Sequence, residues 1–180
     1  MTGTGDFELT MDELRAIARF VTASAWEVLP VFEEAVPGDP RPRAAVEAAL
    51  EFIDGAKRSK LQRVTSLDAH RAAKEAGTES ARLAARSCGD AASAAYLHPI
   101  AQATQVGHIL RAAASAARIG ELAEGGDPSV GDMLIEQARL RATPVVIDVL
   151  RRYPAAPTAK HRVGRLMSTL DSALREPITR

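Results

Sequence analysis

Apolar residues recur along most of the chain at intervals of three and four, the spacing of an amphipathic α-helix. The pattern begins after Thr10 and Glu13, whose spacing is typical of a capping box at a helix start. It predicts a first helix over residues 11–35. A bend is expected at Pro30, because its ring removes a backbone donor from the helix.

Glycine, proline and capping residues divide the rest of the sequence into further helices. Gly-Asp-Pro turns at 38–40 and 126–128 each place an aspartate as a helix cap and a proline at the first helical position. In the third helix, Leu61, Val64, Leu67 and Ala72 are expected to face the core. After the first helix, we expect helices over about 40–56, 60–76, 79–95, 102–123, 129–141, 144–153 and 160–175.

No segment shows a convincing strand pattern. Val145-Val146-Ile147 comes nearest, but it follows Pro144 and continues as an amphipathic segment, so a helix is favoured there. The predicted fold class is therefore all-α, a single compact domain of seven or eight helices packed as a bundle or an orthogonal array. The domain is expected over 10–176, between short tails at 1–9 and 177–180.

Composition supports the all-α fold class and indicates the cellular compartment. The sequence holds 35 alanines and 12 glycines, and alanine has the best intrinsic helix propensity. Cys88 is the single cysteine, which excludes an internal disulfide and a thiolate metal cluster and fits a reducing compartment. No apolar run approaches the ~20 residues of a membrane span, and MTGTGDFELT lacks signal-peptide features. We expect a cytoplasmic protein with no membrane partner.

Charge is unevenly distributed although its sum is zero. Residues 1–56 carry 11 acids against 4 bases, and residues 57–86 carry 3 acids against 8 bases. The zero sum argues against a nucleic-acid partner, because such binding needs a domain-wide excess of Lys and Arg. The acidic first third could meet a basic partner. The plainer interpretation is a solvated surface whose charges compensate one another in three dimensions.

The histidines are the first candidates for chemistry, but none has the spacing of a metal site, since both HExxH and Glu-x-x-His are absent. His98 and His108 could approach each other if the turn between them folds the chain back, and His70 could complete a cluster. Tyr96, in the string Tyr-Leu-His-Pro, could act as an acid or ligand donor. In the simpler interpretation the tyrosine anchors a helix end and backbone carbonyls satisfy the imidazoles.

A second candidate group opens the helix at 40–56. An anionic ligand or a partner carboxylate could be bound there by Asp39, Arg41 and Arg43. Helix initiation alone would also explain the presence of Asp39. The sequence has no phosphate-binding GxxxxGK[ST] loop and no G-x-S-x-G elbow. We therefore predict no catalytic residue, no cofactor and no enzymatic activity.

Several strings together resemble a known family, from about residue 10 to 175. The most specific are Tyr-Leu-His-Pro at 96–99 and Gln-Val-Gly-His-Ile-Leu at 105–110. With them come PGDPRPRAAVEAA at 37–49, AHRAAKEAG at 69–77 and ATPVV at 142–146. They resemble small all-helical bacterial proteins described as immunity proteins of polymorphic toxin systems. Members tend to have Gly after His-Ile-Leu, where this chain has Arg111, a change expected to alter the surface of that helix.

The resemblance implies a protein that binds and neutralises a cognate toxin by stoichiometric contact, with no chemistry of its own. If the toxin is basic, the acidic first third would match it and speed encounter. The candidate contact residues are Asp12, Glu13, Glu27, Glu33, Glu34 and Glu51. One alternative is a ligand-binding or metal-binding protein, or an enzyme, with a pocket around Tyr96, His98, His108 and His70. Another is a homo-oligomer docked through alanine-rich faces.

Overall fold

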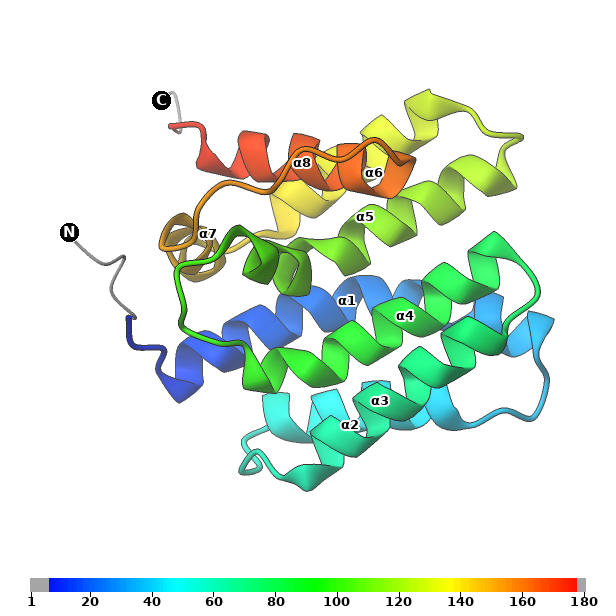
Figure 1. The fold of residues 1–180 in the computed structure, drawn as a ribbon, viewed down its shortest axis with the longest axis horizontal. Coiled ribbons are helices and arrows are strands. Elements are labelled where there is room, and N and C mark those ends of the chain that lie inside the picture. Colours follow the sequence, from blue (N-terminus) through cyan, green and yellow to red (C-terminus); the bar gives the residue numbers. More distant parts are fainter. Residues whose placement is uncertain (1–6, 178–180) are drawn as a thin grey trace.

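The computed structural model describes residues 7–177, and this part of the chain is helical, with eight α-helices and no strand, as the sequence predicts (Figure 1). The α-helices are α1 (Met11–Ala35), α2 (Arg41–Ile53), α3 (Lys60–Glu75), α4 (Glu79–Ser93), α5 (Val106–Ala123), α6 (Pro128–Arg141), α7 (Pro144–Arg151) and α8 (Arg162–Arg175). Two short 3-10 helices, η1 (Ala94–Tyr96) and η2 (Ala103–Gln105), lie between α4 and α5.

α4 is the central helix. α1 and α4 run through the middle of the molecule, with α2 and α3 on one side and α5, α6 and α8 on the other (Figure 1). The most extensive packing joins α4 to α1, α3 and α5. Apart from Asp90, the buried face of α4 consists of small residues, which let neighbouring backbones approach closely. They include Ala81, Ala84, Ala85, Ser87, Cys88, Gly89, Ala91 and Ala92.

The starts of the first helices follow the predicted capping chemistry, with a shift of one residue at α2, whereas α5 begins at Val106 rather than near 102 because η2 precedes it. At α1, Thr10 Oγ1 accepts a hydrogen bond from Glu13 N at 3.2 Å, and the Glu13 carboxylate accepts one from Thr10 N at 2.8 Å, which completes the capping box. α2 begins one residue later than expected, because Pro40 occupies the cap position. Asp39 still caps this turn by accepting a hydrogen bond from Arg41 N at 3.1 Å.

The buried face of α3 differs from the prediction. Leu61, Val64 and Leu67 are 42%, 41% and 58% exposed, so the expectation that they face the core is wrong; Ala72 alone of the four is buried. The buried positions are Gln62, Thr65, Ser66, Ala69, Ala72 and Ala73.

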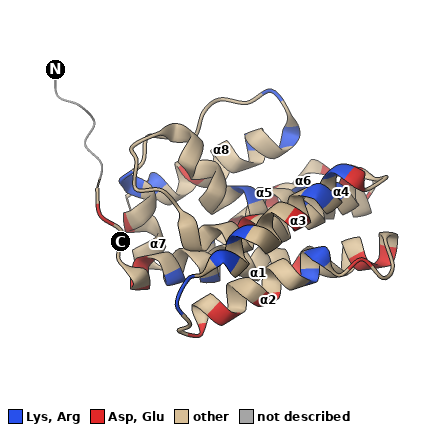
Figure 2. Cartoon of the chain, turned by 60° about the horizontal axis from the view of Figure 1, so that its bottom comes forward, with Lys and Arg blue, Asp and Glu red and all other residues tan. Residues whose placement is uncertain are grey.

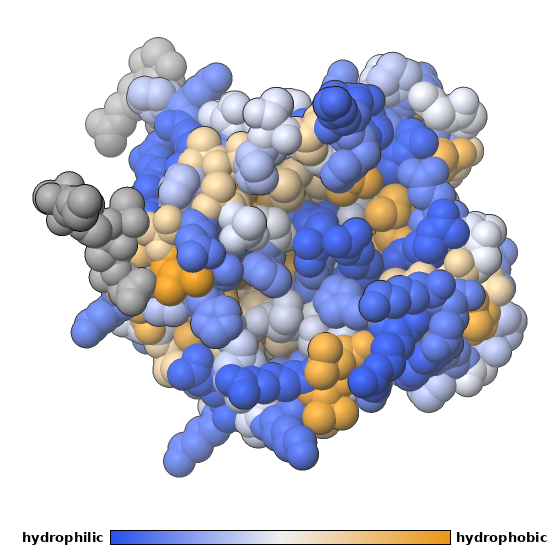
Figure 3. All heavy atoms as spheres, in the orientation of Figure 1, coloured by the Kyte–Doolittle hydropathy of each residue, from blue (hydrophilic) through white to orange (hydrophobic). Residues whose placement is uncertain are grey.

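Backbone acceptors on both neighbours explain this rotation of α3. Gln62 Nε2 donates to the Ala48 carbonyl of α2 at 3.0 Å, and Ser66 Oγ donates to the Gly89 carbonyl of α4 at 2.9 Å. Buried polar side chains that find such partners cost little to bury, and small residues between them allow close helix packing. The larger aliphatic residues therefore face outward, and apolar side chains are visible on the surface over α3 (Figure 3).

Three buried carboxylates are each held by arginine. Asp90 on α4 binds Arg111, and Asp171 on α8 binds Arg175 at 2.8 Å. Glu121 at the end of α5 binds both Arg118 and Arg162. Burying a charge is tolerated only when it is paired and hydrogen-bonded. The Asp90 pair therefore joins α4 to α5, and the Glu121–Arg162 pair joins α5 to α8, whereas the Asp171 pair lies within α8.

The start of the described chain is packed on the core. Phe7 N donates to the Pro99 carbonyl at 3.1 Å, and its ring meets Tyr153 edge-on with centroids 4.9 Å apart. Residues 1–6 and 178–180, which make up most of the two predicted tails, lie outside the described residues. No helix within residues 7–177 is both long enough and apolar enough to cross a membrane.

Candidate functional site

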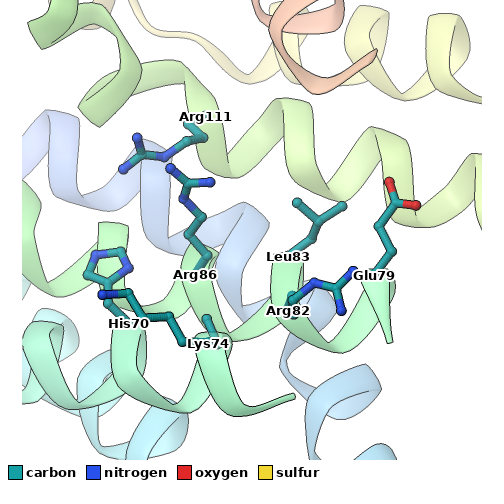
Figure 4. A pocket seen from close by; sticks show the side chains of 8 residues that line it. His70, Lys74, Glu79, Arg82, Leu83, Arg86 and Arg111 are labelled. Atoms are coloured by element: carbon teal, nitrogen blue, oxygen red, sulfur yellow. The ribbon is translucent and has the colours of Figure 1, made fainter. Parts of the chain in front are cut away.

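A cavity of about 520 Å³ opens between α3, α4 and α5, and half of its lining residues are lysine or arginine (Figure 4). His70 and Lys74 lie one turn apart on α3, and Arg82 and Arg86 lie one turn apart on α4. Arg111 reaches the cavity from α5. Since i and i+4 positions share a helix face, the two helices present four basic or imidazole side chains to the same space.

Asp90 lies beneath this cavity. It is 1% exposed, and Arg111 holds it through two hydrogen bonds, Nε to Oδ2 at 2.9 Å and Nη2 to Oδ1 at 2.5 Å. His70 Nε2 lies 3.8 Å from Oδ1 of the same carboxylate. The imidazole reaches this position because Gly89 has no side chain: a Cβ there would lie 2.8 Å from His70 Nε2. Arg111 thus binds the buried Asp90 while it also lines the surface of the cavity.

Burial and neighbouring cations lower the pKa values of His70 and His108. Burial lowers the pKa of His70, Asp90 opposes this effect, and Arg111 and Arg86 add to it. The pKa of His108 is also lowered, first by burial and then by Arg111. The positive charge of the cavity at neutral pH therefore comes from its lysine and arginines.

The arginines of the cavity crowd one another. The guanidinium group of Arg86 lies beside that of Arg111, and hydrophilic side chains gather over the space between α4 and α5 (Figures 3 and 4). Burial lowers the pKa of Arg86, and the charge of Arg111 lowers it further. Within residues 7–177, Lys74, Arg82 and Arg86 form no salt bridge. The site is suited to binding an anion.

A second candidate site lies on α1 and α2. Trp26 is 50% exposed and lines a groove of about 460 Å³ together with Leu50 and Ile53. Next to this groove, Glu47 and Glu51 on α2 and Asp54 just after it are exposed at helical spacing, and acidic residues mark this side of α2 in Figure 2. We call Trp26, its groove and these three carboxylates the acidic face.

A comparison with models of known protein families identifies the family of this chain. The model of the family described as Imm-5 like putative immunity protein matches residues 8–127, well over half of the chain. The chain belongs to this family. Membership implies a protein toxin as the general kind of partner. Neither curated proteins nor solved structures gave a match. The matched part of this Imm-5 like protein runs from α1 to α5 and includes both the cavity and the acidic face.

The Imm-5 like chain does not assemble the predicted histidine pocket in the expected form. Tyr96 turns away from it: its hydroxyl donates to the Ser59 carbonyl at 2.9 Å, and Arg63 lies 4.1 Å from its ring centroid. His98 is exposed. His70 and His108 are close enough to Asp90 and to each other for their charges to interact. Among residues 7–177, no group of three His, Cys, Asp or Glu side chains is placed to hold a metal ion.

At the start of α2, the residues predicted to bind an anion form ion pairs within the protein instead. Arg41 binds Asp39 and Glu75, each at 2.6 Å, and Arg43 binds Glu33 at 2.6 Å. The hydrogen bond from Arg41 holds the pKa of Asp39 below its usual range. These side chains join α1, α2 and α3 rather than facing a cavity.

The six acidic candidates fall into two sets. Four of them pair within the protein, and the hydrogen bonds from their partners hold the pKa values of Glu13 and Glu33 below the usual range. These pairs are Asp12 with Arg15, Glu13 with Arg152, Glu27 with Arg141 and Glu33 with Arg43. Glu34 and Glu51 are exposed and form no salt bridge within the described residues.

The sequence interpretation missed two sets of residues. On the acidic face it missed Trp26, Glu47 and Asp54. In the cavity it missed Arg86 and Asp90. The i, i+4, i+7 spacing of residues 47, 51 and 54 was a usable signal for the acidic face. Only the packing of α3 and α5 on α4 reveals Asp90 as the buried centre of the cavity.

Proposed function

We propose that this chain is an immunity protein that neutralises a basic protein toxin by stoichiometric contact through the acidic face. The family match supports the class of function, and the exposed Trp26 beside unpaired carboxylates supports the choice of surface. Tryptophan is enriched among the residues that carry most of an interface's binding energy. A half-exposed tryptophan at the edge of an apolar groove is a suitable anchor for a partner side chain.

The charges of this surface suit rapid encounter with a basic toxin. Glu47, Glu51 and Asp54 form no salt bridge within residues 7–177, so their charges act outward on an approaching partner. Rim charges of this kind mainly raise the association rate, and the gain falls as salt screens them. Of the sequence candidates, Glu51 lies on the acidic face, and Glu27 lines its groove, where Arg141 pairs with it. Glu34 is exposed but lies outside the residues that define this face.

The proposal requires no catalytic residue, because covering or locking the toxin is sufficient for protection. It places the protein in the cytoplasm of the cell that makes the toxin. Self-association through the same groove would compete with toxin binding, so the complex should contain one copy of the chain per toxin domain.

The test is protection of a bacterial host that expresses the toxin domain encoded beside the gene for this chain. The wild-type chain is expected to restore growth and to form a 1:1 complex in solution. Trp26→Ala should weaken binding at least tenfold, as is common for a central tryptophan. The triple variant Glu47→Gln, Glu51→Gln, Asp54→Asn should slow association and lose most of its salt dependence.

A matched triple variant removes the same charge elsewhere. Glu8, Glu124 and Asp148 are exposed and lie outside α1 and α2, so Glu8→Gln, Glu124→Gln, Asp148→Asn serves as the control. Equal slowing by both triple variants would show attraction by net charge alone and would contradict the proposed surface. The absence of a toxin gene beside this gene, or full toxicity in the presence of the chain, would contradict the function itself.

A further inference from the structure

The cavity between α3, α4 and α5 holds more positive charge than the carboxylates around it neutralise. Glu79 is the one carboxylate among its described lining residues, and Arg118, from outside the cavity, binds it at 3.0 Å. Lys74, Arg82 and Arg86 remain without an ion pair in the described part of the chain. A concave surface with unmatched cations attracts anions, because its walls focus the field.

Arg86, which is exposed, and Arg111, which is partly buried, provide the donors. Arg111 uses Nε and Nη2 to bind Asp90, so its Nη1 group is not engaged with that carboxylate. The Arg86 guanidinium lies beside it in Figure 4. Bringing two like charges together in a partly buried site is unfavourable, and an anion between them would remove the repulsion and accept hydrogen bonds from both.

We propose that this cavity binds a phosphate-bearing small molecule, with the phosphate held between Arg86 and Arg111 and the organic part packed against Ala73 and Leu83. Guanidinium groups match the geometry of phosphate oxygens, and Lys74 at the rim adds a further positive charge. The volume of about 520 Å³ lies within the range of small-molecule sites, and two apolar residues in its wall suit the organic part.

A neighbouring cavity supports the central place of the two arginines. It has a volume of about 400 Å³, extends toward α8, and shares Leu83, Arg86 and Arg111 with the first. The two guanidinium groups therefore stand where both cavities meet and can be approached from either side. This inference stands apart from toxin binding, because the acidic face lies on α1 and α2 rather than on the helices of the cavity.

The test measures binding of phenyl phosphate to the purified full chain by titration calorimetry in a buffer of low ionic strength. Phenyl phosphate carries a dianion and an apolar ring, inorganic phosphate carries the anion alone, and phenol carries the ring alone. We expect phenyl phosphate to bind more tightly than inorganic phosphate, and phenol to give no detectable heat. Arg86→Gln should weaken the binding of phenyl phosphate about tenfold or more, since it removes a charged hydrogen-bonding partner.

Arg71→Gln is the matched control. Arg71 lies on α3, pairs with Asp68 and is exposed, so this variant removes the same charge without touching the cavity. It should bind phenyl phosphate as the wild type does, and thermal unfolding would verify that both variants are folded. Equal loss in both variants, or wild-type affinity in Arg86→Gln, would overturn the site. Equal affinity for inorganic phosphate and phenyl phosphate would overturn the assignment of an organic ligand.

Discussion

The acidic face and the cationic cavity use charge in opposite ways. On the acidic face the carboxylates are exposed, and those of Glu47, Glu51 and Asp54 form no salt bridge with the described chain. In the cavity, Asp90 is buried and binds Arg111 directly. Exposed charges contribute little to stability but act at a distance on a partner, whereas a buried pair is strongly coupled to the fold. Substitutions in the cavity should therefore change the stability of the fold, whereas substitutions on the acidic face should change the binding of a partner.

The largest expected effect is at Asp90. Asp90→Asn keeps the shape of the side chain but removes the charge, which leaves Arg111 in a partly buried site beside Arg86. We expect the free energy of unfolding to fall by about 3 kcal/mol, as when one partner of a buried ion pair is removed. Urea unfolding followed by circular dichroism measures this. A loss equal to that of Glu51→Gln would show that the two regions do not differ in this respect.

The next largest effect is a dependence of the free energy of unfolding on pH, which we expect from the cavity and not from the acidic face. Because burial lowers the pKa of His70 and His108, the unfolded chain takes up protons first as the pH falls below 6.5. Stability is full above that pH and should decline as the pH falls toward the folded pKa values, by up to about 1.4 kcal/mol for each unit of difference. The acidic-face carboxylates are exposed and distant from both imidazoles in the sequence, so a variant there serves as the control.

Urea unfolding at pH 7.5 and at pH 5.5 measures this loss. His70→Gln should reduce the difference between the two pH values, while Glu51→Gln should leave it unchanged. An unchanged difference in the His70 variant would contradict a neutral, partly buried imidazole at this position.

The sequence predicts a feature well when the residues that determine it are close together in the chain, and poorly when they are far apart. The helices follow from caps and periodicity, and the start of α1 was predicted correctly, because Thr10 and Glu13 are neighbours on one turn. The buried face of α3 was not predictable from periodicity, since Leu61 and Leu67 match a core stripe as well as any residues do. Their exposure follows from long-range hydrogen bonds of Gln62 and Ser66 to other helices.

The same distinction applies to the two sites. The acid excess of residues 1–56 locates the acidic face to within two helices, and the basic residues of 57–86 mark two walls of the cavity. Asp90 and Arg111 are 21 residues apart, so no local pattern joins them. The predicted cluster with Tyr96 failed for a related reason: its hydroxyl binds the Ser59 carbonyl, a partner 37 residues away.

A smaller effect of opposite sign is expected at Arg86. Arg86→Gln removes a positive charge that lies beside Arg111 and has no carboxylate partner among the described residues, so in phosphate-free buffer it should raise the free energy of unfolding by about 0.5 kcal/mol. Salt should reduce the gain by screening the repulsion. Unfolding in low and high concentrations of sodium chloride measures both. A destabilised variant would show that Arg86 is held by favourable contacts.

The smallest effect on stability is expected on the acidic face. Glu47→Gln, Glu51→Gln and Asp54→Asn each remove an exposed charge, and each should change the free energy of unfolding by less than about 0.5 kcal/mol. Glu47 and Glu51 are like charges one turn apart, so neutralising one of them should stabilise α2 slightly. Unfolding of the single variants measures this. A loss of more than about 1 kcal/mol at any of the three positions would place that carboxylate in a structural role and remove it from the surface available to a partner.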